Sequence, residues 1–132
     1  MLQTFTATDP QTNDMPCRTP QVRAAISKLP SPLSCVIVGI ESHICVTQTT
    51  LDLLRDGHKV YVIMDGVSSC NKEEVPVALA RLRQEGAVVC TSESWLYECV
   101  GDAGIAEFKE VIKLVKDSNS SNKEVLQTLC KI

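Results

Sequence analysis

The residues best suited to chemistry lie between Gly39 and Val46, where a cysteine follows closely on a glycine turn. Ser42 is a residue type that commonly caps a helix, so we expect a helix from His43 onward, with Cys45 at its third position. Backbone N–H groups and the dipole at the start of a helix stabilise a thiolate. The spacing therefore predicts a cysteine nucleophile. The alternative, a small core residue, stays open because cysteine is often buried.

The other cysteines and the histidines give no sign of a metal site or a disulfide framework. The chain has seven cysteines, an odd number, without CxxC spacing, and its histidines are His43 and His58. His43 precedes Cys45 by two positions, which on a helix turns the two side chains to different faces. We therefore expect free thiols and no metal ion.

Two strands and a helix are expected to position this stretch. The apolar run 35–38 is bounded by turn residues and predicts a strand over about 34–38 that is buried on both faces. A helix is expected over 43–56, ending at Gly57, and a second strand over 59–64. Further predicted elements are helix 73–85, strand 87–90, a short helix that is capped by Thr91 or Ser92 and carries 95–100, helix 105–116, a polar linker at 117–122 and a loosely attached tail helix over 123–132.

This alternation of strands and helices predicts the fold class. It indicates right-handed βαβ units and a mostly parallel sheet in a three-layer, Rossmann-like α/β/α fold. Functional sites in such folds lie at the carboxyl ends of the strands. We therefore expect Gly39–Cys45, Asp65–Ser69 and Cys90–Ser92 to gather at one end of the sheet.

Composition limits the possible functions. The 132 residues carry a net charge of −3 and show no basic stripe, which argues against nucleic acid as a partner. No apolar run approaches the roughly 18 residues of a membrane span, and the N-terminus lacks a signal-peptide pattern. We expect a cytoplasmic protein without a membrane partner.

An ordered series of motifs resembles the isochorismatase-like cysteine hydrolases, and in particular the animal isochorismatase domain-containing proteins of types 1 and 2. The series begins with Gly39–Val46 and runs on along the chain. It continues with Thr49–Leu53, Gly57, Asp65–Ser69, Ala78–Leu82, Gly86, Thr91–Glu93, Val100–Ala103 and Phe108–Glu110. The likeness extends from about Pro20 to Asp117, and the order of the matches makes it specific.

The resemblance implies a site. In this family the cysteine that matches Cys45 attacks the carbonyl of an amide or ester, or a related electrophile, without a cofactor. The peptide bond that matches Ile40–Glu41 is often cis, and the N–H groups that match Glu41 and Cys45 form the oxyanion hole. The resemblance also implies a small-molecule substrate and self-association into oligomers.

The resemblance is incomplete before Pro20. The family's catalytic Asp and Lys have no convincing match, since no lysine precedes Lys28 and Asp9 lies too close to Pro20. The chain therefore resembles a domain shortened at its N-terminal side. An irregular segment at 1–19 would precede the domain at 20–117, and a linker and tail would follow at 118–132.

A sheet without its N-terminal strands would leave strand 34–38 as an open apolar edge, a site for pairing with another chain. The missing Lys and poorly placed Asp leave two hypotheses open. One is a cysteine hydrolase, inactive if this shortened form lacks its acid and lysine. The other is a non-catalytic interaction protein that binds a protein partner through the open edge.

Overall fold

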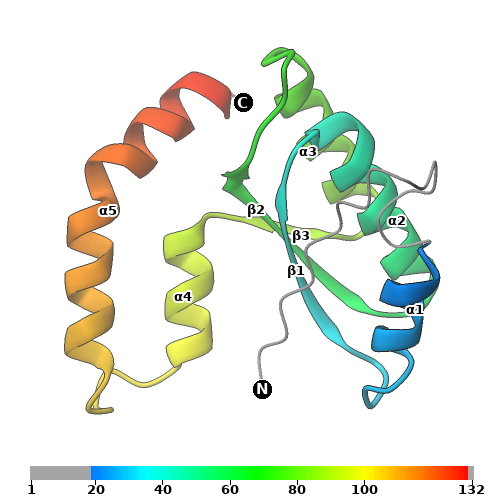
Figure 1. The fold of residues 1–132 in the computed structure, drawn as a ribbon. Coiled ribbons are helices and arrows are strands. Elements are labelled where there is room, and N and C mark those ends of the chain that lie inside the picture. The colour runs from blue at the N-terminus through cyan, green and yellow to red at the C-terminus, as the bar shows by residue number, and fades with distance from the viewer. Residues whose placement is uncertain (1–18, 131–132) are drawn as a thin grey trace.

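The computed structural model describes residues 19–130, which form a three-stranded parallel sheet with helices on both faces (Figure 1). The strands are β1 (Ser34–Gly39), β2 (Lys59–Val67) and β3 (Val88–Cys90), in that spatial order. Both strand pairs are parallel, which confirms the predicted α/β fold. The predictions for the N-terminal segment, including Asp9, lie outside the described residues.

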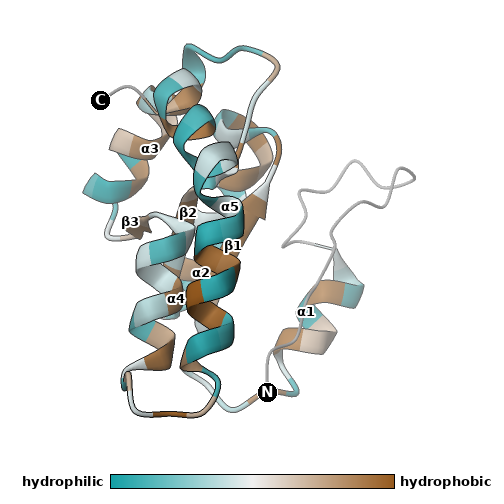
Figure 2. Ribbon diagram, turned by 90° about the vertical axis from the view of Figure 1, so that its left-hand side faces the viewer, coloured by the Kyte–Doolittle hydropathy of each residue, from teal (hydrophilic) through white to brown (hydrophobic). Residues whose placement is uncertain are grey.

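The helices form the two outer layers. They are α1 (Pro20–Ile26), the π-helical turn η2 (Ser42–Val46), α2 (Thr47–Arg55), α3 (Glu74–Gln84), α4 (Ser92–Val100) and α5 (Phe108–Leu129). α2 and α3 cover one face of the sheet, whereas α4 and the end of α5 cover the other (Figure 1). Figure 2 shows α4 and α5 side by side in front of the sheet. No helix among residues 19–130 is both long enough and apolar enough to cross a membrane.

The core lies between β2 and the helices on either side. Val60 and Val62 of β2 are almost fully buried against Leu51 of α2 and Leu79 and Leu82 of α3. The central strand of a parallel sheet has neighbours on both edges and helices on both faces, so apolar residues occupy nearly every position. The apolar run of β2 thus builds the centre of the domain.

β1 is the exposed edge of this sheet. Within residues 19–130, its only strand partner is β2, and Val38 is 62 % exposed. Ile40, just beyond the strand, is 68 % exposed. The expected open, apolar edge is therefore present. The prediction that the strand is buried on both faces is wrong for the described part of the chain, because among residues 19–130 no element covers one edge and part of one face.

β2 is longer than its sequence pattern indicates. The strand continues through Asp65 and Gly66 to Val67, although an Asp-Gly pair favours a turn. The parallel pairing is irregular here, since Ile37 pairs with Val62 but Gly39 pairs with Val67. The turn residues are therefore accommodated as a bulge within the strand, which shifts its register.

The prediction of a polar linker at 117–122 is wrong. α5 runs unbroken from Phe108 to Leu129, straight through the polar stretch at 117–122. Its half-buried face keeps helical spacing throughout, with Ser118 and Asn122 at positions in phase with the apolar residues. The residues of this face are Phe108, Val111, Ile112, Val115, Ser118, Asn122, Val125, Leu126 and Leu129. The helix continues through the polar stretch because Ser118 and Asn122 lie on the same face as the apolar residues.

The end of α5 is docked onto the sheet rather than loosely attached. Leu126 and Leu129 pack against the core, and Cys130 is 6 % exposed. The Cys130 thiol donates a hydrogen bond to the carbonyl oxygen of Met64 in β2, with Sγ 3.2 Å from the oxygen. The prediction of a loose tail is wrong for these residues, since apolar contacts hold the helix end in place.

Candidate functional site

The turns after β1 and β2 lie against each other at the carboxyl end of the sheet. The N–H of Ser42 donates to the carbonyl of Ser68 at 2.9 Å, and the N–H of Ser68 donates to the carbonyl of Gly39 at 3.2 Å. β3 adds its own turn, because the N–H and hydroxyl of Ser92 donate to the Asp65 carboxylate at 2.7 and 2.6 Å. The three expected segments therefore gather at one end.

Cys45 lies in the turn that follows β1. The Ile40–Glu41 peptide bond is cis, as the resemblance implies. The carbonyl of Glu41 accepts hydrogen bonds from the N–H groups of Ile44 at 3.2 Å and Val46 at 3.1 Å, which closes a π-helical turn. Cys45 is half-buried within this turn, immediately before α2.

The predicted cap is displaced by one residue. Glu41, not Ser42, is the N-cap, so Cys45 is the fourth helical residue rather than the third. Ser42 is 1 % exposed, and its hydroxyl has no hydrogen-bond partner within residues 19–130. Its carbonyl accepts instead from the Thr47 hydroxyl at 2.7 Å. Ser42 cannot cap because its own backbone is already part of the turn.

The Glu41 side chain crosses from this turn to the turn after β2. Its Oε2 atom accepts from the Ser69 hydroxyl at 2.7 Å and from the N–H of Cys70 at 2.8 Å. The Ser69 bond, followed by the Cys70 bond, lowers the pKa of the Glu41 carboxyl below its ordinary value. His43 Nδ1 lies 3.1 Å from Ser69 Oγ and joins the same cluster.

Sequence reasoning found Glu41 but missed Ser69 and Cys70 as its partners. Both belong to the region around the end of β2, and the sequence indicates only that Ser69 suits a helix start. Their shared position at the carboxyl end of a parallel strand was the available signal. The contact joins residues 28 and 29 positions apart, and local sequence patterns do not encode such pairing.

Three of the described cysteines have thiols with a raised pKa. Burial raises the pKa of the Cys35 and Cys130 thiols, the latter with help from Asp65. Burial, with the carboxylates of Glu98 and Asp65, also raises the pKa of the Cys90 thiol. These three groups are held protonated, so they are poor nucleophiles. All six cysteines among the described residues are free thiols.

Residues 19–130 contain no group of three or more His, Cys, Asp or Glu side chains placed to hold a metal ion. The described cysteines and histidines lie on different elements, apart from His43 and Cys45, which share η2.

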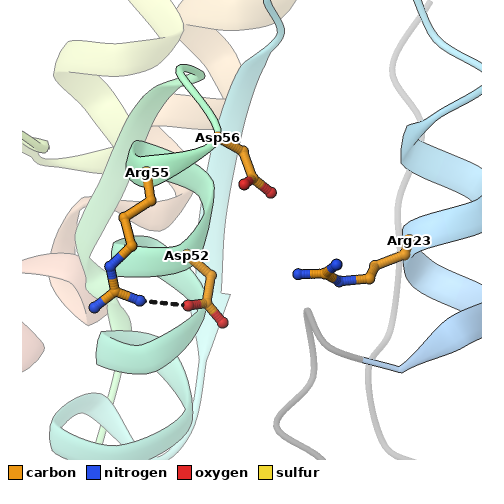
Figure 3. A pocket seen from close by; sticks show the side chains of 4 residues that line it. All are labelled: Arg23, Asp52, Arg55 and Asp56. Atoms are coloured by element: carbon orange, nitrogen blue, oxygen red, sulfur yellow. Dashed lines mark hydrogen bonds and ion pairs between the residues drawn. The ribbon is translucent and has the colours of Figure 1, made fainter.

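A cavity of about 430 Å³ lies between α1 and α2, away from Cys45 (Figure 3). Arg23 of α1 points across it toward Asp52 of α2 and toward Asp56, the C-cap of that helix. Arg55 forms a 2.7 Å ion pair with Asp52. A second cavity of about 300 Å³ shares Arg23, Asp52 and Asp56. The end of α2 leads into the start of β2, so both cavities lie at the amino ends of the strands, opposite the expected site.

Comparison with known proteins identifies related chains. Residues 22–94 match the isochorismatase domain. The chain is 43 % identical over 98 residues to isochorismatase domain-containing protein 2 of Pongo abelii, covering 74 % of this chain and 48 % of that protein. It is 40 % identical over 99 residues to isochorismatase domain-containing protein 1 of Salmo salar, covering 75 % of this chain and 35 % of that protein.

A solved structure supports the same fold. The MAR1 ribonuclease from Caenorhabditis elegans superposes with a TM-score of 0.66 at 38 % identity, covering 74 % of this chain and 50 % of that one. The present chain thus spans about half the length of this ribonuclease and of the Pongo abelii protein. The matched half includes β1, η2 and β2, the elements that form the turns around Cys45.

Proposed function

The chain belongs to the isochorismatase family, and we propose that it is a hydrolase whose nucleophile is Cys45. The observation that carries this proposal is the place of Cys45 in the chain. It lies in the first helical turn after β1, at the carboxyl end of a parallel sheet, where two strand-end turns are joined by backbone hydrogen bonds. Loops at this end of α/β sheets carry function in many proteins.

The proposed chemistry is acyl transfer to sulfur followed by hydrolysis. The Cys45 thiolate attacks the carbonyl carbon of the substrate, the C–S bond forms, and the carbonyl π electrons move to oxygen. The N–H groups of Glu41 and Cys45 are the proposed donors to this oxyanion. Collapse of the tetrahedral species breaks the C–N or C–O bond and releases the amine or alcohol, which takes a proton from solvent water. A second water molecule then cleaves the C–S bond of the thioester and releases the acid and the thiol.

The proposed substrate class is a small amide or ester, as the family resemblance implies. RNA is not proposed, although the C. elegans neighbour is described as a ribonuclease. The chain has a net charge of −3, and binding to the phosphate backbone of RNA depends on clustered Lys and Arg. A small neutral or weakly charged substrate fits this charge better.

The second candidate function is an interaction protein that uses the exposed edge of β1. Val38 and Ile40 give this edge its apolar character. The family match does not favour this function over hydrolysis, and the two are separable by one variant. Cys45→Ala should abolish hydrolysis, whereas binding through the edge of β1 should survive it.

The first experiment is iodoacetamide labelling of the purified chain at mildly acidic pH, with each cysteine read by mass spectrometry. We expect Cys45 to react at least about tenfold faster than Cys99, an exposed thiol on α4, because a helix start favours the thiolate. Denaturant should remove this difference. Equal labelling of the two thiols in the folded chain would refute a selectively activated Cys45.

Hydrolysis of p-nitrophenyl acetate provides the matching functional test. Turnover by the full chain should disappear in Cys45→Ala and persist in Cys99→Ala, the matched control. Retained turnover in Cys45→Ala would exclude this residue as the nucleophile.

A further inference from the structure

The Glu41 carboxylate connects two turns through a single oxygen atom. Ser69 and the Cys70 N–H both donate to Oε2, at 2.7 and 2.8 Å. Two donors from the connection between β2 and α3 therefore converge on one acceptor from the turn after β1. The backbone bonds from Ser42 to Ser68 and from Ser68 to Gly39 join the same two turns nearby, so the side chain adds a further point of attachment.

The protons of this cluster can be assigned by counting donors. Ser69 has one hydroxyl proton and gives it to Glu41, so its oxygen can only accept from its other neighbours. The N–H of Asn71 donates to that oxygen at 3.2 Å. His43 Nδ1, 3.1 Å away, must therefore carry a proton and donate as well.

We propose that Glu41 is a positioning residue for the Cys45 turn, acting through the bonds of its side chain to Ser69 and Cys70. This inference rests on the proposed hydrolase function. The carbonyl of Glu41 accepts from Ile44 and Val46 and so shapes the turn that carries Cys45, and its N–H is one of the proposed oxyanion donors. One residue thus has its backbone at the reacting centre and its side chain anchored on the neighbouring strand end.

The anchor depends on pH through Glu41. The titratable groups that act on its carboxyl are Cys70, on the connection after β2, and His43, on its own turn. The hydrogen bond from Ser69, above all, keeps the pKa of Glu41 low, so the carboxylate stays ionised in mild acid. Protonation on further acidification replaces the ionised acceptor with a neutral one, which weakens both bonds to Oε2 without removing them.

Three variants of the full chain test this inference with p-nitrophenyl acetate as the probe. Glu41→Ala removes the acceptor, Glu41→Gln keeps an amide oxygen that can accept both bonds but removes the charge, and Glu110→Ala is a control on an exposed stretch of α5. Misplacement of reacting groups by about 1 Å can cost about 100-fold in rate. We expect kcat to fall at least about tenfold in Glu41→Ala with little change in KM, and to stay within about threefold of the parent in Glu41→Gln.

The pH profile gives a readout that a merely structural role would not move. The acid limb of kcat that belongs to Glu41 should be absent in Glu41→Gln and present in the control. An unchanged kcat in Glu41→Ala, or an equal loss in Glu41→Gln, would overturn the inference. If Glu41→Ala fails to fold, Ser69→Ala tests the inference instead, because it removes the hydroxyl that donates to Glu41. This variant should lower kcat but still show a cooperative thermal unfolding transition.

The failure of the inference is distinguishable from failure of the proposed function. Loss of turnover in Cys45→Ala with unchanged kcat in Glu41→Ala leaves the nucleophile standing and refutes only the positioning role. Retained turnover in Cys45→Ala refutes the nucleophile and, with it, the positioning role.

Discussion

Ser92 donates two hydrogen bonds to Asp65, one from its backbone N–H at 2.7 Å and one from its hydroxyl at 2.6 Å. Asp65 lies near the end of β2, and Ser92 is the first residue of α4. The carboxylate therefore anchors the start of α4, where negative charge also interacts favourably with the helix dipole. Asn122 of α5 extends the contact by donating to Ser92 Oγ at 3.4 Å.

Replacing Asp65 should destabilise the fold. Asp65→Ala removes an acceptor of two charge-assisted hydrogen bonds and leaves the Ser92 N–H without this partner, so we expect a loss of about 1.5–3 kcal/mol. Urea unfolding followed by circular dichroism measures the change. Asp117→Ala, on the exposed side of α5, is the control and should stay within about 0.5 kcal/mol of the parent. A loss no larger than that of the control would show that the anchor contributes nothing.

A substitution at Ser42 tests whether this residue lies inside the turn, as observed, or caps the helix, as predicted. Its hydroxyl is buried without a partner among the described residues, so Ser42→Ala removes an unsatisfied polar group. We expect the free energy of unfolding to be unchanged or to rise by up to about 1 kcal/mol. A capping serine would instead lose about 1 kcal/mol on the same substitution. Thr91→Ala provides the contrast, because the Thr91 hydroxyl does cap α4 by accepting from the N–H of Ser94.

The continuity of α5 is testable at Ser120, an exposed residue inside the stretch with linker-like composition. In a helix, alanine is favoured over glycine by about 1 kcal/mol per exposed position. Ser120→Ala should therefore be more stable than Ser120→Gly by about that amount in urea unfolding. Equal stabilities would mean that residue 120 lies in an irregular segment, as its composition alone indicates.

Buried thiols should make stability fall at alkaline pH. Burial raises the pKa of Cys130 in the folded state, so the unfolded chain loses this proton first as the pH rises. The contribution of Cys130 is complete below the ordinary thiol pKa and is lost as the pH rises through the higher folded-state value. The urea midpoint should therefore drop less between about pH 7.5 and 9.5 in Cys130→Ala than in the parent chain. An equal drop in both would rule out a contribution from this thiol.

Local sequence patterns predict the strands and most of the helices because burial and periodicity are local properties. The apolar run at 35–38 and the alternation of strands and helices are enough for the parallel sheet and for the placement of Cys45 at its carboxyl end. The Glu41–Ser69 contact escapes such patterns because it joins two turns that meet only in the folded sheet. The length of α5 is not predicted by such patterns because Ser118 and Asn122 are residue types common in linkers. Only their spacing along the helix shows that they lie on its half-buried face.

Gly66 and Val38 should behave as a coupled pair. A Cβ at position 66 would lie 2.9 Å from Val38 Cγ1, closer than two carbon atoms can approach without a shift. Gly66→Ala should therefore destabilise the chain by about 1–3 kcal/mol, the usual cost of overpacking. Val38 is mostly exposed, so Val38→Ala alone should cost little.

The double variant decides whether this contact is the cause. Val38→Ala removes the methyl group that the new Cβ at position 66 would meet, so the combined variant should recover about 1 kcal/mol or more relative to the sum of the single changes. Urea unfolding of the four chains gives this coupling directly. Strict additivity would mean that the cost of Gly66→Ala arises from Ile63, whose Cγ2 would lie 3.2 Å from the new atom, and not from the edge strand. Coupling would instead establish that Gly66, in the bulge of β2, contacts Val38 at the exposed end of β1.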